Sequence, residues 1–281
     1  LVVIDMDRTL LDDNKSIPEY NIKVLRILHQ MGIKIIIATG RRYFFAKPAL
    51  ETLQIPLVVL ANNGNSVWIM NQDIKISAKY LSVEVFHEIL KEGHKRGLYP
   101  VLHVDHYEKG CDLITEYQYT HPAYNSYVTP GSSRHKVVEN LFEITEPNVM
   151  VMCYAAPTDI LKNFQDYIRQ NFHDSTQSHI TYSLTRVGAM LEISHISGTK
   201  WQTALEYANS VGIERSEIIA IGDDSNDLNM IENAGLGVAM KNAMPHVKEA
   251  AKIITGHDNN NAGVAHVLAG IFGIDSKDLN L

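Results

Sequence analysis

The sequence predicts an α/β fold in which a doubly wound parallel sheet carries an inserted α+β domain. Four short apolar runs have the length and the Val, Ile, Leu and Ala content of strands that are buried on both faces. Polar residues directly follow each run, and the middle third of the chain alternates helical and strand-like patterns differently. The four expected strands are Leu1–Ile4, Ile33–Ala38, Leu57–Ala61 and Ile218–Ile221.

The first two runs enclose an expected helix. Apolar residues recur at helical spacing over Pro18–Met31, and Pro18 suits the first turn of a helix. Strand, helix and strand in this order form a βαβ unit. After the third run, Ser66–Met70 and Asp73–Ser77 are expected to form a hairpin across Asn71-Gln72.

The middle of the chain predicts a separate α+β domain. Amphipathic helices are expected over Val83–Arg96 and Thr158–Asn171, and strand-like runs accompany each of them. This order indicates two similar halves. The pattern of the first sheet then resumes with a helix over Lys200–Val211. The expected strands of the insertion are Tyr99–Val104, Cys111–Thr115, Val149–Tyr154, His179–Leu184 and Ala189–Ile193.

The length agrees with this division, because 281 residues at about 150 per domain correspond to roughly two domains. The expected core comprises residues 1–80 and 191–281, and the expected insertion comprises residues 81–190. A hydrophobic content of 45% with 20% charged residues is typical of a globular chain with a sizeable core. A disordered or fibrous chain is therefore excluded.

Charge and cysteine content exclude further classes. The 25 Lys and Arg against 32 Asp and Glu leave a net charge of −7, which offers no broad basic surface to a nucleic acid. Cys111 and Cys153 cannot form a disulfide framework and are expected to be reduced core thiols. No apolar run reaches the roughly 18 residues that a membrane span needs. We expect a cytoplasmic protein, monomeric or weakly dimeric, that binds neither nucleic acid nor membrane.

Polar groups follow the carboxyl ends of all four expected strands. In an open parallel sheet these ends meet at one edge, where ligands bind. The pattern therefore predicts a single site before any motif is considered. Its candidate residues are Asp5-Met6-Asp7, Thr39-Gly40-Arg41, Asn62-Asn63-Gly64 and Gly222-Asp223-Asp224.

Carboxylates dominate this set. Asp5 and Asp7 stand two residues apart, so on an extended strand end both side chains point to the same side, and Asp223 and Asp227 join them from another strand end. Two carboxylates about 4 Å apart repel by roughly 4 kcal/mol at an effective dielectric constant of 20, which calls for a metal, a shared proton or a cationic partner. All-oxygen ligation favours Mg²⁺. Alternatively, Asp223, Asp224 and Asp227 only cap the helix that is expected near Asn226–Asn233.

Four motifs occur in a fixed order along the core segments. They are Asp5-Met6-Asp7-Arg8-Thr9-Leu10, Thr39-Gly40-Arg41, Lys200, and Gly222-Asp223-Asp224-Ser225-Asn226-Asp227. Together they resemble the motifs of the haloacid dehalogenase superfamily, and most closely the small-molecule phosphatases of its Cof-like branch. The inserted segment is similar only in position and layout, which resemble a type IIB cap. The resemblance implies a Rossmann-like core and a cap domain that selects the substrate.

The resemblance also implies roles for single residues. Asp5 would be the nucleophile that forms an aspartyl-phosphate, and Asp7 would be the general acid and then the base that activates water. Mg²⁺ would be held by Asp5, the Asp7 backbone carbonyl and Asp223, with Asp227 as a ligand or as a supporting partner. The groups that would bind the phosphoryl oxygens are Thr39, Arg41, Lys200, Asn226 and the backbone N–H groups of Met6 and Gly40.

One residue departs from the family pattern. Arg8 stands where the family usually has glycine, which permits a positive φ and leaves room beside the site. In the favoured interpretation the backbone is ordinary at this position and Arg8 points outward. In the alternative, Arg8 adds a positive charge near the substrate entrance.

The function that follows is Mg²⁺-dependent hydrolysis of a small phosphomonoester, such as a sugar phosphate, pyridoxal phosphate or flavin mononucleotide. A phosphomutase or phosphotransferase using the same intermediate is one alternative, and a non-catalytic binder of phosphorylated metabolites is another. The intact Asp7 argues against the binder. A cluster in the expected cap lies either at the surface or against the organic half of a substrate, and comprises Tyr117, Tyr119, His121, Tyr124 and Tyr127.

Overall fold

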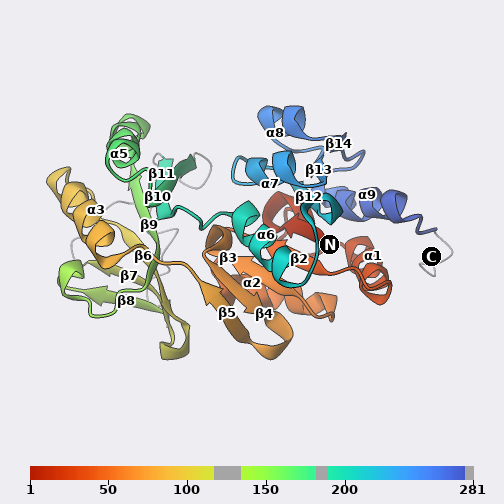
Figure 1. The fold of residues 1–281 in the computed structure, drawn as a ribbon, viewed down its shortest axis with the longest axis horizontal. Helices are drawn as coiled ribbons and strands as arrows, with labels where there is room; N and C mark the ends of the chain where they lie inside the picture. Colours follow the sequence, from red (N-terminus) through yellow and green to blue (C-terminus); the bar gives the residue numbers. More distant parts are fainter. Residues whose placement is uncertain (117–133, 182–188, 276–281) are drawn as a thin grey trace. The chain divides into compact units, whose positions relative to one another are not determined.

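The computed structural model describes residues 1–116, 134–181 and 189–275, which form two compact units (Figure 1). The first unit comprises Leu1–Ser77 and Thr199–Leu281, and the second comprises Ala78–Gly198. The expected boundary between residues 190 and 191 is wrong, because it would cut strand β11 (Ala189–His195). This strand pairs along its length with two strands of the second unit, so that unit continues to Gly198.

The first unit is built on an eight-stranded sheet in the order β14-β13-β12-β1-β2-β3-β4-β5. The strands from β14 to β3 are parallel, and β4 runs antiparallel to β3. This arrangement confirms the parallel α/β core that the sequence predicts. The strands are β1 (Val2–Asp5), β2 (Ile35–Ala38), β3 (Val58–Ala61), β4 (Ser66–Ile69), β5 (Ile74–Ala78), β12 (Ile219–Gly222), β13 (Leu236–Ala239) and β14 (Ile253–Ile254).

Helices connect and cover these strands, and all four residues of β1, β2 and β3 are buried, as expected of central parallel strands. The short strand β13 has no counterpart in the sequence prediction, because its glycine hides the apolar pattern. A Cβ on Gly237 would lie 1.9 Å from the Ile231 carbonyl oxygen, so glycine lets a helix approach the strand closely. The helices are α1 (Glu19–Gln30), α2 (Tyr43–Leu50), α6 (Lys200–Ser210), α7 (Leu228–Asn233), α8 (Pro245–Ala250) and α9 (Gly263–Phe272).

The second unit contains a six-stranded sheet in the order β10-β11-β9-β6-β7-β8. Helix α3 (Val83–Lys95) is followed by the antiparallel pair β6 and β7, and α5 (Thr158–Asn171) by the antiparallel pair β10 and β11. This is the repeated order that the sequence predicts. The remaining strands are β6 (Val101–His106), β7 (Cys111–Glu116), β8 (His135–Val138), β9 (Val149–Ala156) and β10 (Thr176–Thr181).

Helices α3 and α5 share one hydrophobic core with the sheet of the second unit. Phe86 of α3 and Phe164 of α5 are fully buried there together with Leu102 and Leu191 of the strands. A smaller apolar cluster that includes Val151 contains no residue of either helix. The helices therefore pack on one face of this sheet.

Some expectations fall on residues that the structure does not describe. The aromatic cluster at residues 117–127 lies outside the described residues, and so does the end of the expected strand His179–Leu184. Among the residues that are described, no helix is long and apolar enough to cross a membrane.

Candidate active site

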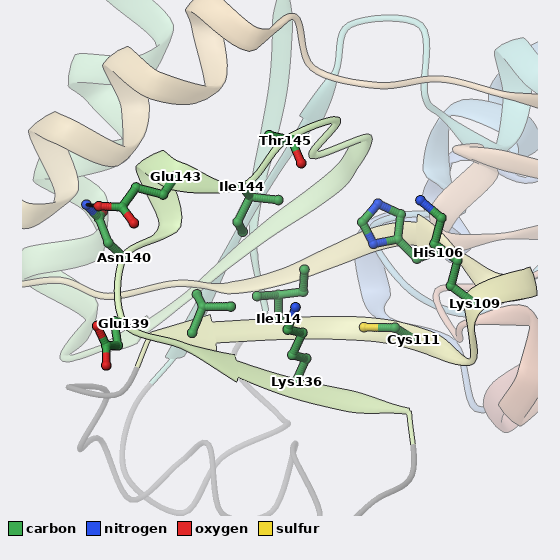
Figure 2. Close-up of a pocket in the computed structure, with 11 residues that line it drawn as sticks. His106, Lys109, Cys111, Ile114, Lys136, Glu139, Asn140, Glu143, Ile144 and Thr145 are labelled. Carbon is green, nitrogen blue, oxygen red and sulfur yellow. Dashed lines mark hydrogen bonds between the residues drawn. The ribbon is translucent and has the colours of Figure 1, made fainter.

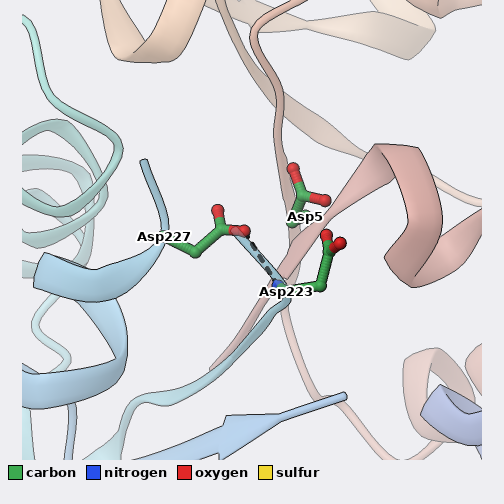
Figure 3. A group of neighbouring side chains, drawn as sticks. All are labelled: Asp5, Asp223 and Asp227. Carbon is green, nitrogen blue, oxygen red and sulfur yellow. Dashed lines mark hydrogen bonds between the residues drawn. The ribbon is translucent and has the colours of Figure 1, made fainter. Parts of the chain in front are cut away.

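Three carboxylates meet at the carboxyl ends of neighbouring strands. Asp5 ends β1, Asp223 follows β12, and these strands pair in parallel with Ile4 opposite Ile221. Asp227 precedes α7 and completes the group. One oxygen from each carboxylate lies within 4.8 Å of the others, and all three residues are buried (Figure 3). The structure thus brings together three of the four acidic residues that the strand ends predict.

Lys200 neutralises part of this charge. Its Nζ donates to Asp5 Oδ1 at 2.6 Å and to Asp227 Oδ1 at 2.7 Å, and the residue is only 2% exposed. Burial disfavours the charged ammonium, but the carboxylates of Asp227 and Asp5 outweigh it and raise the pKa of Lys200. A cation in the first turn of α6 also opposes the helix dipole. Both unfavourable features are compensated by the two carboxylates, which favours a functional role for Lys200.

A close contact positions Lys200. Gly64 has a φ of +94°, and a Cβ at this position would lie 2.4 Å from the Thr199 carbonyl oxygen. The Thr203 hydroxyl donates to the Gly64 carbonyl at 2.8 Å, and the Thr199 hydroxyl caps α6 by accepting from a backbone N–H. Glycine therefore allows the turn after β3 to pack against the first turn of α6, which places the lysine beside Asp5.

Asp227 binds both Lys200 and the loop after β12. Its Oδ2 accepts from the backbone N–H groups of Asp223 at 3.0 Å and Asp224 at 3.1 Å, while Oδ1 accepts from Lys200. Both oxygens are thus engaged, which fits the supporting role better than the ligand role. A Cβ on Gly222 would lie 2.5 Å from the Asp227 side chain. Glycine at this position therefore lets Asp227 fold back over the loop.

Gly222→Ala is expected to damage the site through Asp227. The added methyl group displaces the carboxylate and destabilises the fold by about 1–3 kcal/mol. Urea unfolding measures the loss, and Gly270→Ala is the matched control, because a Cβ there meets nothing within 4 Å. Equal stability of Gly222→Ala and the wild type would contradict the contact.

The cluster carries more negative charge than Lys200 balances. Burial and the Asp227 carboxylate raise the pKa of Asp5 well above its ordinary value, and the same causes raise the pKa of Asp223 to about 7. No hydrogen bond from the described residues reaches Asp5 Oδ2 or Asp223 Oδ2. Two carboxylate oxygens with no such bond, in a buried all-oxygen group, fit a divalent cation such as Mg²⁺.

The raised pKa of Asp223 predicts a pH-dependent stability. Because the metal-free folded protein holds this proton more tightly than the unfolded chain, its free energy of unfolding falls as pH rises from 3.8 to about 7. In EDTA at pH 7.5, Asp223→Asn is therefore expected to be more stable than the wild type by about 1–3 kcal/mol. The difference should vanish near pH 4, and saturating Mg²⁺ should stabilise only the wild type. Urea unfolding at several pH values measures both effects; a pH-independent difference would contradict the assignment.

Asp7 does not join the cluster. Its carboxylate accepts two hydrogen bonds of 2.7 Å from Arg41 and one of 2.9 Å from Lys15. Burial opposes ionisation, but these bonds outweigh it and lower the pKa of Asp7. The expectation that Asp7 joins Asp5 in one acidic group is wrong, because β1 ends at Asp5 and the chain leaves the strand in an irregular turn over Met6–Leu10. The two-residue period of a strand no longer applies there.

The second motif is joined to Asn226 through Asn63. The Thr39 hydroxyl accepts from the Arg41 N–H at 3.1 Å, so it closes a turn and does not cap α2. The Asn63 N–H donates to the Thr39 carbonyl at 2.9 Å, and Asn226 Nδ2 donates to Asn63 Oδ1 at 2.9 Å. A Cβ on Gly40 would lie 3.3 Å from the same oxygen. Thr39, Gly40 and Asn226 therefore gather around one buried asparagine.

The segment after β1 contains Met6, which the first motif predicts, and two residues that sequence reasoning did not single out, Thr9 and Lys15. Met6 is fully buried, and its carbonyl accepts from the Leu11 N–H at 2.9 Å. The buried Thr9 hydroxyl donates to Asp223 Oδ1 at 3.1 Å and so orients that carboxylate. The position of Thr9 in the first motif was a signal for this role. No pattern indicated that Lys15 pairs with an acid eight positions earlier, because that contact depends on the loop.

The favoured interpretation of Arg8 is wrong about its backbone. Its φ of 59° and ψ of 9° place it in the left-handed region, which glycine adopts most easily. The Asn242 side chain donates to the Arg8 carbonyl at 2.7 Å and supports this turn. The side chain is 54% exposed, but its Nε lies 3.8 Å from Asp223 Oδ2. Arg8 thus adopts a backbone conformation that glycine favours and brings a positive charge to the cluster.

The second unit contains a separate cavity of about 490 Å³ (Figure 2). His106, Lys109 and Lys136 line part of it, and Glu143 lies in its wall. None of the motif residues lines it. This cavity therefore does not belong to the carboxylate cluster.

Comparison with known proteins agrees with this geometry. The family model of haloacid dehalogenase-like hydrolases matches residues 2–268. The chain is 31% identical over 275 residues to the protein YxeH of Bacillus subtilis, covering 95% of this chain and 96% of that protein. It is 27% identical over 270 residues to the 5-amino-6-(5-phospho-D-ribitylamino)uracil phosphatase YcsE of the same species, covering 95% of this chain and 94% of YcsE.

Comparison with a solved structure leads to the same family. The crystal structure of a haloacid dehalogenase-like hydrolase from Bacteroides thetaiotaomicron superposes with a TM-score of 0.76 at 25% identity, covering 96% of this chain and 98% of that one. Sequence and fold therefore agree over nearly the whole chain. This chain belongs to the haloacid dehalogenase-like hydrolases.

Proposed function

We propose that the protein is a Mg²⁺-dependent phosphatase that hydrolyses small phosphomonoesters through an aspartyl-phosphate on Asp5. The observation that carries this proposal is the buried contact of Lys200 with Asp5 inside a cluster of three carboxylates. The relative YcsE, named as a phosphatase of a phosphorylated ribitylaminouracil, supports a small phosphorylated metabolite as the substrate class. Sugar phosphates, pyridoxal phosphate and flavin mononucleotide are the compounds to test first.

Charge neutralisation explains the choice of Asp5 as nucleophile. An anionic carboxylate attacks an anionic phosphoryl group only where positive charge offsets their repulsion. Lys200 supplies one such charge at 2.6 Å from Asp5 Oδ1. Mg²⁺, held by Asp5 and Asp223 with the Asp7 backbone carbonyl, would supply the rest as a Lewis acid. Attack by Asp5 then forms a bond to phosphorus and breaks the bond to the leaving oxygen.

Asp7 is assigned the proton transfers. The bonds from Arg41 and Lys15 hold it ionised, which is the form that accepts a proton from the water that hydrolyses the aspartyl-phosphate. Protonation of the leaving oxygen needs the acid form. We assign the switch to Arg41, which would leave Asp7 for a substrate oxygen and so remove part of the positive charge that keeps the pKa of Asp7 low. Asp7 then takes up a proton from solvent, gives it to the leaving oxygen, and regains one from the water that hydrolyses the intermediate.

The remaining motif residues are assigned to the phosphoryl oxygens. Thr39 and Asn226 offer a hydroxyl and an amide, and Met6 and Gly40 offer backbone N–H groups. Lys200 serves both the nucleophile and the phosphoryl group. The second unit, which carries none of these residues, is assigned to substrate selection as a cap.

A metabolite panel tests the proposal. Phosphate release is measured for each phosphomonoester with Mg²⁺ and with EDTA, and we expect turnover of at least one compound only with Mg²⁺. A second sugar is added to detect transfer, because formation of a bisphosphate would indicate a phosphotransferase. Binding of phosphorylated compounds without turnover across the panel would contradict the enzyme assignment and support a binding protein.

A further inference from the structure

Arg8 is the only side chain of the first motif that adds a positive charge beside the carboxylate cluster. Its backbone is in the left-handed region, at φ 59°, which is strained for an L side chain and not for glycine. Arg8 keeps this strained backbone and carries a charge next to buried acids. The presence of arginine at this position is therefore explained by what its charge does there.

The contacts of the guanidinium are few and long. Its Nη2 donates to the Asn242 carbonyl at 3.4 Å, and its Nε lies 3.8 Å from Asp223 Oδ2. The shorter bond of this region, 2.7 Å, runs from the Asn242 side chain to the Arg8 backbone carbonyl and needs no arginine side chain. Packing therefore does not explain the choice of residue, and the ion pair with Asp223 is the contact that only a cation makes.

The ion pair complements the one made by Lys200. Lys200 contacts Asp5 and Asp227 but forms no hydrogen bond or ion pair with Asp223, whose Oδ1 instead accepts from Thr9. Arg8 thus places a second positive charge at the third carboxylate. Each carboxylate of the cluster then has a cationic side chain within 4.0 Å in the metal-free protein.

A cation tethered to the chain competes with a free one. Any divalent cation that binds Asp223 must share this carboxylate with the Arg8 guanidinium and is repelled by its charge. We propose that Arg8 weakens Mg²⁺ binding at the cluster and so sets the Mg²⁺ concentration at which the site fills. This inference rests on the proposed Mg²⁺ site and adds a residue to it that opposes the metal.

Two substitutions separate the charge from the strained backbone. Arg8→Gln removes the charge and Arg8→Lys keeps it, while both place an ordinary L side chain at the same φ. Mg²⁺ binding to each protein is measured by titration calorimetry without substrate. We expect Arg8→Gln to bind Mg²⁺ about threefold to tenfold more tightly than the wild type, and Arg8→Lys to bind it as the wild type does.

Salt provides a second readout. Because the Arg8 side chain is half exposed, salt screens the repulsion between its charge and Mg²⁺, and the advantage of Arg8→Gln should shrink as NaCl rises from about 0.05 to 0.5 M. A purely structural effect of the substitution would not follow salt in this way. Equal or weaker Mg²⁺ binding by Arg8→Gln, or the same gain in Arg8→Lys, would overturn the inference.

The titration also separates this inference from the proposed function. If neither the wild type nor Asp223→Asn binds Mg²⁺, the proposed Mg²⁺ site is contradicted, and the role of Arg8 fails with it. If the wild type binds Mg²⁺ and loses it in Asp223→Asn, but Arg8→Gln binds no more tightly, the metal site stands and the role of Arg8 fails.

Discussion

Asp5→Asn is expected to abolish phosphate release while the fold persists. The amide that replaces the carboxylate does not attack phosphorus, so kcat should fall by a factor on the order of 10³ or more. Burial and Asp227 disfavour ionised Asp5, so removing its charge should not lower the stability of the metal-free protein. Phosphate release and urea unfolding measure the two effects.

A matched substitution controls for the loss of an acid near the site. Asp13 is exposed, and its carboxylate accepts from the side chains of Asn259 and Asn260. Asp13→Asn should keep wild-type turnover within about twofold, because surface changes have small effects. Comparable Mg²⁺-dependent turnover by Asp5→Asn and Asp13→Asn would remove Asp5 from the role of nucleophile.

Lys200→Met is expected to lose both activity and stability. Methionine fills much of the same space but leaves Asp5 and Asp227 buried without their shared cation, and breaking a buried pair in this way costs about 3–5 kcal/mol. The loss should be larger at pH 8 than at pH 5, because protonation relieves the unpaired carboxylates. Turnover should fall by a factor of about 10² or more, since a charge that stabilises the transferring phosphoryl group is gone.

The control for this variant is Lys23→Met. Lys23 makes a surface ion pair with Glu19 one helical turn away, and such pairs contribute only about 0.3–0.5 kcal/mol. Urea unfolding in EDTA and in Mg²⁺ compares the two variants. Mg²⁺ should restore part of the stability of Lys200→Met, because a metal also neutralises Asp5. A loss no larger than that of Lys23→Met would show that the buried ion pairs are not important for the fold.

The sequence predicts the location of the site well because the rule behind it is local. Runs such as Leu1–Ile4 and Ile218–Ile221 are apolar throughout, which identifies central parallel strands, and the residues after them meet at one sheet edge. Asp5 and Asp223 therefore come together as expected. Lys200 is placed by its motif and by its unfavourable position at a helix start.

Other features depend on contacts that no local pattern encodes. Asp7 lies outside the acidic cluster because strand β1 ends at Asp5, two residues before Asp7, and its partners Arg41 and Lys15 come from two separate loops. Arg8 takes a positive φ because its turn is held by Asn242, more than two hundred residues away. Such long-range constraints override the preferences of single residues.

The most direct test of the account traps the phosphoryl group on Asp5. Asp7→Asn is mixed with labelled p-nitrophenyl phosphate, whose leaving group needs no acid, so the first step proceeds while hydrolysis of the intermediate is slowed. With Mg²⁺ we expect a burst of about one nitrophenolate per protein and label on the peptide that contains Asp5. EDTA, or the further substitution Asp5→Asn, should abolish both. Turnover without label on the protein, or label on another residue, would contradict the account.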